Sequence, residues 1–458
     1  MKIKTINPAT EEVLSEYDIM PKEMVFDIAK SARKAQKSWG GLPLKKREEL
    51  MKRAAAVLRE NKEEYAKLMT LEMGKPITES RGEIEKCAWT AEIYAGKAEE
   101  WLKDEQMEAD GLKHLITYQP LGTVLAIMPW NFPFWQAFRF AIPTLLAGNA
   151  AILKHASNVT GSALKIEEVF RKAGFPENVF RTIIAEHSAV NELIGSDYVQ
   201  AVSLTGSTEA GARIAEAAGR HIKKVVLELG GSDPFIVLED ADMDFAVENA
   251  VRGRMLNMGQ SCISAKRFIV HESIADEFAR KVAERFSKII IGNPLDEKTQ
   301  GGPLINKKAV EQINRQVQDS IKQGAKLLTG GKAIGSKGSF YEPTLLYNVR
   351  RDMKVACEEV FGPVGAVMPF KTAEEAVEIA NSSEFGLGGS VFTKDLKKGE
   401  EIVRKIESGS VFVNSFTKSD PRMPFGGIKK SGIGRELSKL GIREFTNAKG
   451  ISVYKHGK

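Results

Sequence analysis

The first hundred residues show apolar side chains recurring at helical spacing. From about Pro21 to Glu105 an apolar residue returns every three or four positions, with charged residues between them. This pattern predicts amphipathic helices with charged outer faces. Cys87 falls within one of these helices, and we expect it to pack there as a small apolar side chain.

Beyond residue 121 the pattern changes to short, β-rich apolar runs that alternate with helical segments. Alternation of this kind predicts a doubly wound parallel sheet, which binds ligands at the carboxyl ends of its strands. The expected strands of this first unit are 123–129, 149–155, 179–185, 201–206 and 223–230, and its expected helices are 160–173, 189–194 and 208–218.

A second α/β unit is expected between about Gly231 and Pro424, followed by a glycine-rich loop, a short helix and a final strand at 450–455. Residues 114–119 alternate weakly and predict a β-hairpin arm. The expected strands of the second unit are 235–238, 267–271, 342–349, 365–370, 389–393 and 410–414, and its expected helices are 245–258, 274–288, 307–323, 373–382 and 398–406.

The chain has 458 residues, which is more than a single core usually supports, so two or more domains are expected. Its 66 basic and 60 acidic residues give a net charge of +6 and are scattered without a basic block. This distribution does not favour nucleic acid as a partner, and it mildly favours anionic substrates.

Cysteine and histidine are sparse. The three cysteines cannot form a disulfide framework, which favours a reducing compartment, and the six histidines show no ligand spacing, so no metal site is expected. The N-terminus is too polar and acidic for a targeting segment, and prolines interrupt the most apolar stretch, 121–153. We therefore expect a cytoplasmic protein that does not span a membrane.

The segment 225–264 offers a candidate base and a candidate nucleophile. Glu228 ends an apolar run, and a carboxylate among apolar neighbours tends to have a raised pKa, as a general base near neutral pH requires. Cys262 follows a Gly-Gln-Ser sequence that predicts a tight turn presenting the thiol. The alternatives are a solvated acid at a sheet edge and a buried structural cysteine. If the fold brings the two groups together, they form an acyl-transfer site.

Two loops carry further candidate polar groups. Asn131 lies between prolines in PWNFP, where its amide can donate to an oxyanion beside a thiol; alone it would be a turn residue next to proline. The turn at Gly206 and Ser207 opens a helix but lacks the middle glycine of G-x-G-x-x-G. It is either a phosphate-binding helix N-terminus or a plain connection.

Six motifs occur in order along the chain: PWNFP, LTGSTEAG, LELGGSDPF, GQSC, EEVFGPV and PFGGIKKSGIGRE. Together they resemble the aldehyde dehydrogenase superfamily over essentially the whole length, and within it the shorter succinate-semialdehyde dehydrogenases. The resemblance implies two Rossmann-like α/β domains and a small β arm for oligomerisation, giving a homodimer or homotetramer. The implied divisions are a cofactor-binding domain at 1–108 and 121–229, a catalytic domain at 230–428 and an arm at 109–120 and 443–458.

The resemblance also implies a nicotinamide cofactor. Many NAD-selective relatives have an acid where Ser157 stands here, and an acid there would repel the 2′-phosphate of NADP. We therefore expect NADP to be accepted, with NAD also usable. Without the resemblance, Lys154 would be a solvated lysine, Glu359 a surface acid and Phe361 a core aromatic. The implied cofactor-binding residues are Trp130, Lys154, Ser157, Gly206, Ser207, Glu359 and Phe361.

The resemblance assigns Arg139 to the substrate carboxylate, because succinate-semialdehyde dehydrogenases resemble one another in carrying an arginine there, and a guanidinium fork suits a carboxylate. The second arginine of some members is replaced by Leu256, and the nearby Arg254 is expected to point elsewhere. Trp135 and Phe425 are expected as apolar walls of the substrate channel, or as simple core.

The expected function is NAD(P)-dependent oxidation of succinate semialdehyde, or a similar short aldehyde acid, through a thiohemiacetal and a thioester on Cys262. Water activated by Glu228 is expected to hydrolyse the thioester. The alternatives are oxidation of another small aldehyde such as lactaldehyde or glutarate semialdehyde, a thiol hydrolase without redox chemistry, and a non-catalytic relative like the lens crystallins of this superfamily.

Overall fold

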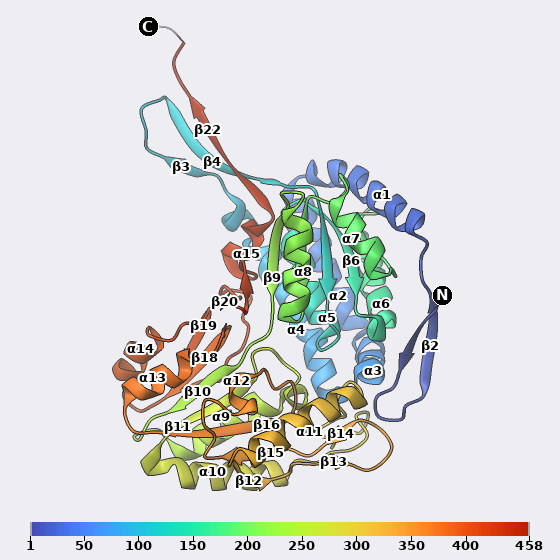
Figure 1. Ribbon diagram of the computed structural model, residues 1–458. Coiled ribbons are helices and arrows are strands. Elements are labelled where there is room, and N and C mark those ends of the chain that lie inside the picture. Colours follow the sequence, from blue (N-terminus) through green and yellow to red (C-terminus); the bar gives the residue numbers. More distant parts are fainter. Residues whose placement is uncertain (1, 457–458) are drawn as a thin grey trace.

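The computed structural model describes residues 2–456 and consists of two α/β units with a β arm that projects from them (Figure 1). Residues 1, 457 and 458, at the ends of the expected cofactor-binding domain and arm, lie outside the described residues. Within 2–456, no helix combines the length and the apolar character that crossing a membrane requires. The α/β class predicted from the sequence is confirmed.

The N-terminal region is helical, as the apolar spacing predicted. Cys87 lies within the fourth helix and is fully buried in the core, as expected. A hairpin that the pattern did not predict precedes the helices, because its strands are largely exposed and carry no apolar alternation. The elements are β1 (Lys2–Ile6), β2 (Val13–Asp18), α1 (Lys22–Gly40), α2 (Leu44–Glu60), α3 (Lys62–Met73) and α4 (Ile77–Leu102).

The first sheet has the strand order β21-β9-β8-β5-β6-β7, and all of its strands are parallel except β21. β5 lies between β6 and β8. The chain adds β6 and β7 on one side of β5, and then β8 and β9 on the other side. Such a topological switch point is where α/β sheets bind ligands, beyond the carboxyl ends of the strands. The strands are β5 (Thr123–Met128), β6 (Ala150–His155), β7 (Phe180–Thr182), β8 (Ala201–Thr205), β9 (Lys224–Glu228) and β21 (Gly432–Ile433).

Helices flank this sheet. One of them, α5 (Pro133–Leu146), was missed in the sequence because Pro133, Arg139 and Pro143 interrupt its apolar run. Pro133 occupies the first turn, where a helix has no partner for the missing N–H, and every residue of α5 is buried. The other elements are η1 (Ser157–Val159), α6 (Thr160–Lys172), α7 (His187–Gly195) and α8 (Thr208–Gly219).

The second sheet has the order β12-β15-β16-β11-β10-β18-β19 and is parallel except for β12. The helix expected at 245–258 ends earlier, because the chain turns into a left-handed conformation at Asn257. The elements are β10 (Asp233–Val237), α9 (Met243–Met255), η2 (Leu256–Gly259), β11 (Ala265–His271), α10 (Glu272–Ser287), α11 (Lys307–Lys322), β12 (Lys326–Thr329), β13 (Ala333–Ile334), β14 (Phe340–Tyr341), β15 (Thr344–Tyr347), α12 (Lys354–Cys357), β16 (Val364–Phe370), α13 (Ala373–Asn381), β17 (Phe385–Gly386), β18 (Gly388–Phe392), α14 (Leu396–Val403), β19 (Ser410–Val413) and β20 (Ile428–Lys429).

The arm is a three-stranded antiparallel sheet of order β22-β4-β3 that extends from the body (Figure 1). Its strands are β3 (Glu105–Met107), β4 (Lys113–Pro120) and β22 (Thr446–Val453), the last preceded by α15 (Ser438–Glu444). The predicted hairpin arm is therefore present. The final strand begins at Thr446 instead of residue 450, because its first half is polar and gives no apolar signal.

Candidate functional site

Cys262 follows a left-handed turn that leads from α9 toward β11. Asn257, Met258 and Gly259 have φ angles of 51°, 51° and 71°. Non-glycine residues hold this conformation only where the surroundings impose it, and such residues cluster at functional sites. A Cβ at Gly259 would lie 2.3 Å from the carbonyl oxygen of Gly362, so only glycine fits there. The fold therefore constrains the backbone just before the thiol.

Lys266 fixes the loop that carries the thiol. Its buried ammonium group donates to the carbonyl oxygens of Ser261, Cys262 and Ser264 at 3.1, 2.7 and 3.3 Å. Burial raises the pKa of the Cys262 thiol to about 12, although the charges of Arg139 and Lys266 oppose the rise. In this state of the protein the thiol holds its proton near neutral pH.

Two cavities meet at Cys262. The first, here called the thiol cavity, has a volume of about 370 Å³, and the second, the interlobe cavity, about 260 Å³. Cys262 and Gln136 line both of them. The thiol cavity contains Lys86, Trp135, Arg139, Ser419 and Phe425, and the interlobe cavity contains Trp130, Asn131, Gly206, Ser207, Glu359 and Phe361.

Asn131 is held rigidly just beyond β5. Its side-chain amide donates to the backbone carbonyl oxygen of Gln260 at 3.1 Å. The backbone carbonyl oxygen of Asn131 accepts from the Asn257 side-chain amide at 2.9 Å. The residue is 4% exposed. The structure thus brings Asn131 to the same cavity as Cys262, although the two are far apart in the sequence.

Glu228 ends β9 and is buried. Neither of its carboxylate oxygens has a hydrogen-bond partner among the described residues. Burial, and then the charge of Glu436, raise the pKa of Glu228 well above its usual range. The charge of Glu228 in turn contributes to the raised pKa of Cys262, so the two groups lie within electrostatic reach of each other. An unpaired, buried carboxyl group within electrostatic reach of a thiol is a candidate general base.

The interlobe cavity gathers most of the residues that the motifs suggested for a cofactor. Trp130 and Phe361 meet edge to face, with ring centroids 5.8 Å apart. Glu359 accepts a hydrogen bond from the Gly231 N–H at 2.9 Å, and a Cβ at Gly230 would lie 2.5 Å from the Glu359 carboxylate. The glycine pair therefore lets the carboxylate approach the backbone at this edge of the cavity.

Gly206 and Ser207 connect β8 to the N-terminus of α8. The Ser207 hydroxyl caps this helix by accepting from the Ala210 N–H at 3.2 Å. Both residues line the interlobe cavity, so the helix N-terminus opens onto it. That arrangement favours a negatively charged group in the cavity, which is the first of the two alternatives that the sequence left open for this turn.

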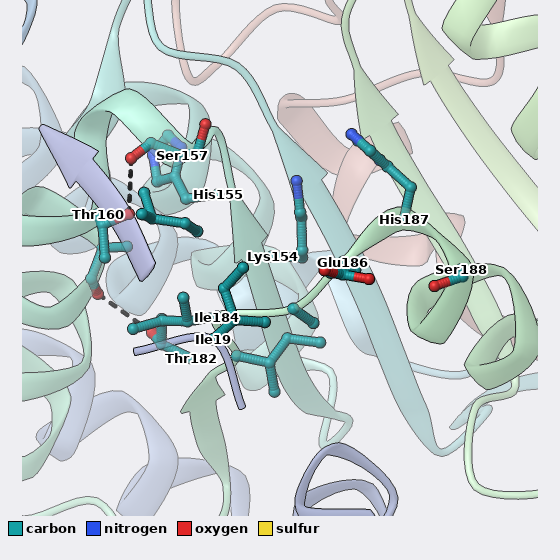
Figure 2. Close-up of a pocket in the computed structure, with 14 residues that line it drawn as sticks. Ile19, Lys154, His155, Ser157, Thr160, Thr182, Ile184, Glu186, His187 and Ser188 are labelled. Carbon is teal, nitrogen blue, oxygen red and sulfur yellow. Dashed lines mark hydrogen bonds between the residues drawn. The ribbon is translucent and has the colours of Figure 1, made fainter. Parts of the chain in front are cut away.

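A third cavity, here called the strand-end cavity, lies at the carboxyl end of β6 and has a volume of about 440 Å³ (Figure 2). Lys154 and Ser157 line it, together with Glu186 and His187. Figure 2 shows the Lys154 and His187 side chains extending in the same direction. The charge of Lys154, followed by burial, lowers the pKa of His187. Glu186 and His187 were not predicted as site residues, although they directly follow the strand predicted at 179–185, where ligands of such a sheet bind.

Arg139 lines the thiol cavity but is already engaged. Its guanidinium pairs with the Glu436 carboxylate and donates from Nη2 to the Thr205 hydroxyl at 3.2 Å. It also lies 4.7 Å from the centroid of the Phe425 ring. Arg254 points elsewhere, as expected, because it donates to the Ser264 hydroxyl at 2.9 Å and to backbone carbonyls.

Comparison with known proteins agrees with this arrangement. Residues 1–451 match the aldehyde dehydrogenase family. The chain is 48% identical over 451 residues to the probable succinate-semialdehyde dehydrogenase NADP(+) of Synechocystis sp., covering 98% of this chain and 99% of that protein. It is 44% identical over 446 residues to the succinate semialdehyde dehydrogenase NAD(P)+ Sad of Escherichia coli, covering 97% and 96%.

The likeness extends to three dimensions. The succinic semialdehyde dehydrogenase from Streptococcus pyogenes, solved in complex with NADP+ as the cofactor, matches with a TM-score of 0.97 at 38% identity. The match covers 99% of this chain and 100% of that one. A full-length match of both sequence and fold, with the thiol between two cavities, places the chain in the aldehyde dehydrogenase family.

Proposed function

We propose that the protein oxidises succinate semialdehyde, or a similarly short aldehyde acid, to the carboxylate with NADP or NAD as the acceptor. The observation that carries the proposal is the position of Cys262, which lines both the interlobe cavity and the thiol cavity. A cofactor in the first and an aldehyde in the second would meet at the thiol. Relatives at 48% and 44% identity that are named for this activity support the same conclusion.

The interlobe and strand-end cavities fit a dinucleotide, because they lie beyond the carboxyl ends of β5, β6 and β8 at the switch point of the sheet. Lys154 and Ser157 would hold the adenosine end, and Glu359 and Phe361 the nicotinamide end. When bound, the cofactor accepts the hydride that leaves the substrate carbon. Ser157 brings no negative charge to the strand-end cavity, which supports acceptance of the 2′-phosphate of NADP.

The thiol proton of Cys262 passes to solvent water, and the thiolate attacks the aldehyde carbon. The carbon–oxygen π bond breaks as the carbon–sulfur bond forms, which leaves an oxyanion. The Asn131 amide and the Cys262 backbone N–H then donate to the oxyanion, where such donors stabilise the transition state. When hydride leaves this carbon, a thioester remains on Cys262. Asn131 is buried and held by its own hydrogen bonds, so it needs little reorganisation to act.

Glu228 then removes a proton from water, and the resulting hydroxide adds to the thioester. The carbon–sulfur bond breaks, Glu228 passes its proton to the departing sulfur, and the acid leaves with the Cys262 thiol restored. Burial raises the pKa of Glu228 well above its usual range, which makes this carboxylate a stronger base than an exposed glutamate. Because Glu228 does not line either cavity, we propose that its side chain rotates toward Cys262 when it acts.

The thiol cavity suits a small anionic substrate. Its volume of about 370 Å³ accommodates a four-carbon acid, Trp135 and Phe425 form apolar walls, and cationic side chains approach it from several elements. We therefore propose that the substrate carries a carboxylate. The cationic residues that line the cavity are Lys86, Arg139, Arg252 and Lys418.

The test is kcat/KM for succinate semialdehyde, glutarate semialdehyde and lactaldehyde, each with NADP and with NAD. We expect the highest value for succinate semialdehyde with NADP. A higher value for lactaldehyde, which carries no carboxylate, would overturn the substrate assignment. Absence of reduced cofactor with every aldehyde would instead indicate a crystallin-like or purely hydrolytic relative.

We also propose that the protein forms a homodimer or homotetramer through its arm. Ile451 and Val453 on β22 are 38% and 43% exposed, which supports a contact with another copy of the chain. Light scattering should show a smaller assembly when both are replaced by glutamate.

The domain divisions expected from the motifs remain a proposal, as does a cytoplasmic location, which the free cysteines support.

A further inference from the structure

We propose that Lys86, together with Ser419, binds the carboxylate of the substrate in the thiol cavity. The inference rests on the proposed function, because it names the contact that would select an aldehyde acid. Lys86 lies on α4, in the N-terminal helical region, whereas Ser419 lies in the loop that follows β19. The pair therefore joins two segments that are more than three hundred residues apart.

The geometry places an ammonium group at the wall of the cavity. The Lys86 Nζ donates to the Ser419 hydroxyl at 2.5 Å and lies 4.2 Å from the centroid of the Trp135 ring. Lys86, Ser419, Trp135 and Cys262 all line the thiol cavity. A carboxylate there can accept from the ammonium and from the hydroxyl while its aldehyde end points toward the thiol.

The charge of Lys86 has no carboxylate partner within residues 2–456, and both nearby acids are engaged elsewhere. Glu83 pairs with Lys75 and accepts from the Trp135 N–H at 2.9 Å. Asp420 accepts from the Arg422 guanidinium at 2.9 and 2.7 Å. Lys86 is therefore a cation available for an anionic ligand.

Arg139 is less available than Lys86. Arg139 forms a buried ion pair with Glu436. If Arg139 turned to bind a substrate carboxylate, this pair would break, and breaking a buried ion pair costs folding free energy. Burial, followed by the charge of Arg139, lowers the pKa of Lys86 to about 8. A bound carboxylate would stabilise the charged form of Lys86 and so oppose both causes of the lowered pKa. The positive charge at this wall of the cavity therefore favours binding of an anion.

The other charges around the thiol cavity are compatible with this assignment. Arg252 and Lys418 line the cavity from exposed positions and attract an anion toward it. Two acids also line the cavity, Glu83, which pairs with Lys75, and Glu79, whose pKa is raised by burial to about 7. Near neutral pH this carboxyl group is therefore partly protonated and repels an anion less than an ordinary glutamate would.

The experiment compares succinate semialdehyde with butanal, an uncharged aldehyde of the same carbon count, in wild type, Lys86→Met and Lys86→Arg. Methionine keeps an unbranched stem against Trp135 but removes the charge. In Lys86→Met we expect kcat/KM for succinate semialdehyde to fall at least tenfold more than kcat/KM for butanal, mainly through KM. Lys86→Arg should recover much of the difference.

The matched control is Lys97→Met, which makes the same substitution on the exposed side of the same helix. It should leave the ratio of the two kcat/KM values as in wild type, and thermal unfolding of all variants checks that they are folded. Equal losses for both aldehydes in Lys86→Met, or no loss for either, would show that Lys86 is structural or irrelevant and would overturn the inference.

A second measurement separates this inference from the proposed function. Butanoate carries the carboxylate without an aldehyde, so its inhibition constant against butanal oxidation reports the anion contact alone. We expect Lys86→Met to raise that constant at least tenfold. If the inhibition constant rises but wild type does not favour succinate semialdehyde over butanal, the anion site stands and the proposed substrate is wrong. If the constant does not change, the anion site is wrong.

Discussion

Arg139, which lines the thiol cavity, forms a buried ion pair with Glu436, in which the two side chains are 2% and 6% exposed. Glu436 precedes α15, so the pair ties the C-terminal segment to α5 of the first unit. The charge of Glu436 also contributes to the raised pKa of Glu228. The ion pair therefore holds two distant segments together, and one of its members also affects the pKa of the proposed base, Glu228.

Glu436→Gln should destabilise the protein, because it leaves the Arg139 charge buried without its partner. We expect a loss of about 3 kcal/mol or more, measured as the shift of the first denaturant-induced transition. The control is Glu400→Gln, which removes an exposed helix pair with Arg404 and should cost less than about 0.5 kcal/mol. Equal stability of Glu436→Gln and wild type would mean that the pair contributes nothing.

Glu228→Gln should stop the reaction after the first turnover. The variant retains Cys262 and the cofactor cavities, so it should give a single burst of reduced cofactor, while steady-state turnover falls roughly 10²- to 10⁴-fold. Rapid-mixing absorbance at the reduced-nicotinamide band measures both quantities. Steady-state rates equal to those of wild type would remove Glu228 from the role of base.

Asn131→Ala should lower kcat about 10²- to 10³-fold with little change in KM, since the amide is proposed to act on the oxyanion of the transition state. Asn249→Ala serves as the control, because Asn249 is half-buried on α9 and lines neither the thiol cavity nor the interlobe cavity, so it should leave kcat as in wild type. An unchanged kcat in Asn131→Ala would show that the Asn131 amide does not stabilise the oxyanion, and that the Cys262 backbone N–H is the remaining donor.

Ser157→Glu should shift the cofactor preference toward NAD. A carboxylate beside Lys154 would repel the 2′-phosphate of NADP, and we expect kcat/KM for NADP to fall at least tenfold, which corresponds to about 1.4 kcal/mol. Ser157→Ala removes the hydroxyl without adding charge and should have a smaller effect. If the glutamate variant keeps its ratio of NADP to NAD activity, the adenosine end lies elsewhere.

Alkylation of Cys262 by iodoacetamide should be slow at pH 7 in the absence of cofactor. Because the pKa of this thiol is raised to about 12, the thiolate fraction is small and grows about tenfold per pH unit between pH 7 and 9. Peptide mass spectrometry follows Cys262 separately from the exposed Cys357 and the buried Cys87. A rate that levels off below pH 9 would show a thiol that is already activated in the free protein.

Some local features could be predicted because their signals are contiguous in the sequence. The apolar run around Glu228 predicted a strand at 223–230, and β9 (Lys224–Glu228) lies within that range but ends two residues earlier, at the carboxylate. The N-terminal helices followed from their apolar spacing. By contrast, α5 was hidden by two prolines and an arginine, because burial of the whole helix overrides the local signal that those residues give.

The class of fold, the motifs of the family and the residue types available for thiol chemistry could be read from the sequence, because periodicity and short motifs are properties of neighbouring residues. Which charges lack a partner became known only from the packed fold. Arg139 meets Glu436 and Lys86 meets Ser419 across hundreds of residues, and no local pattern distinguishes a paired arginine from an unpaired lysine. Electrostatic energy depends on distance and burial, and both are fixed only when remote segments pack together.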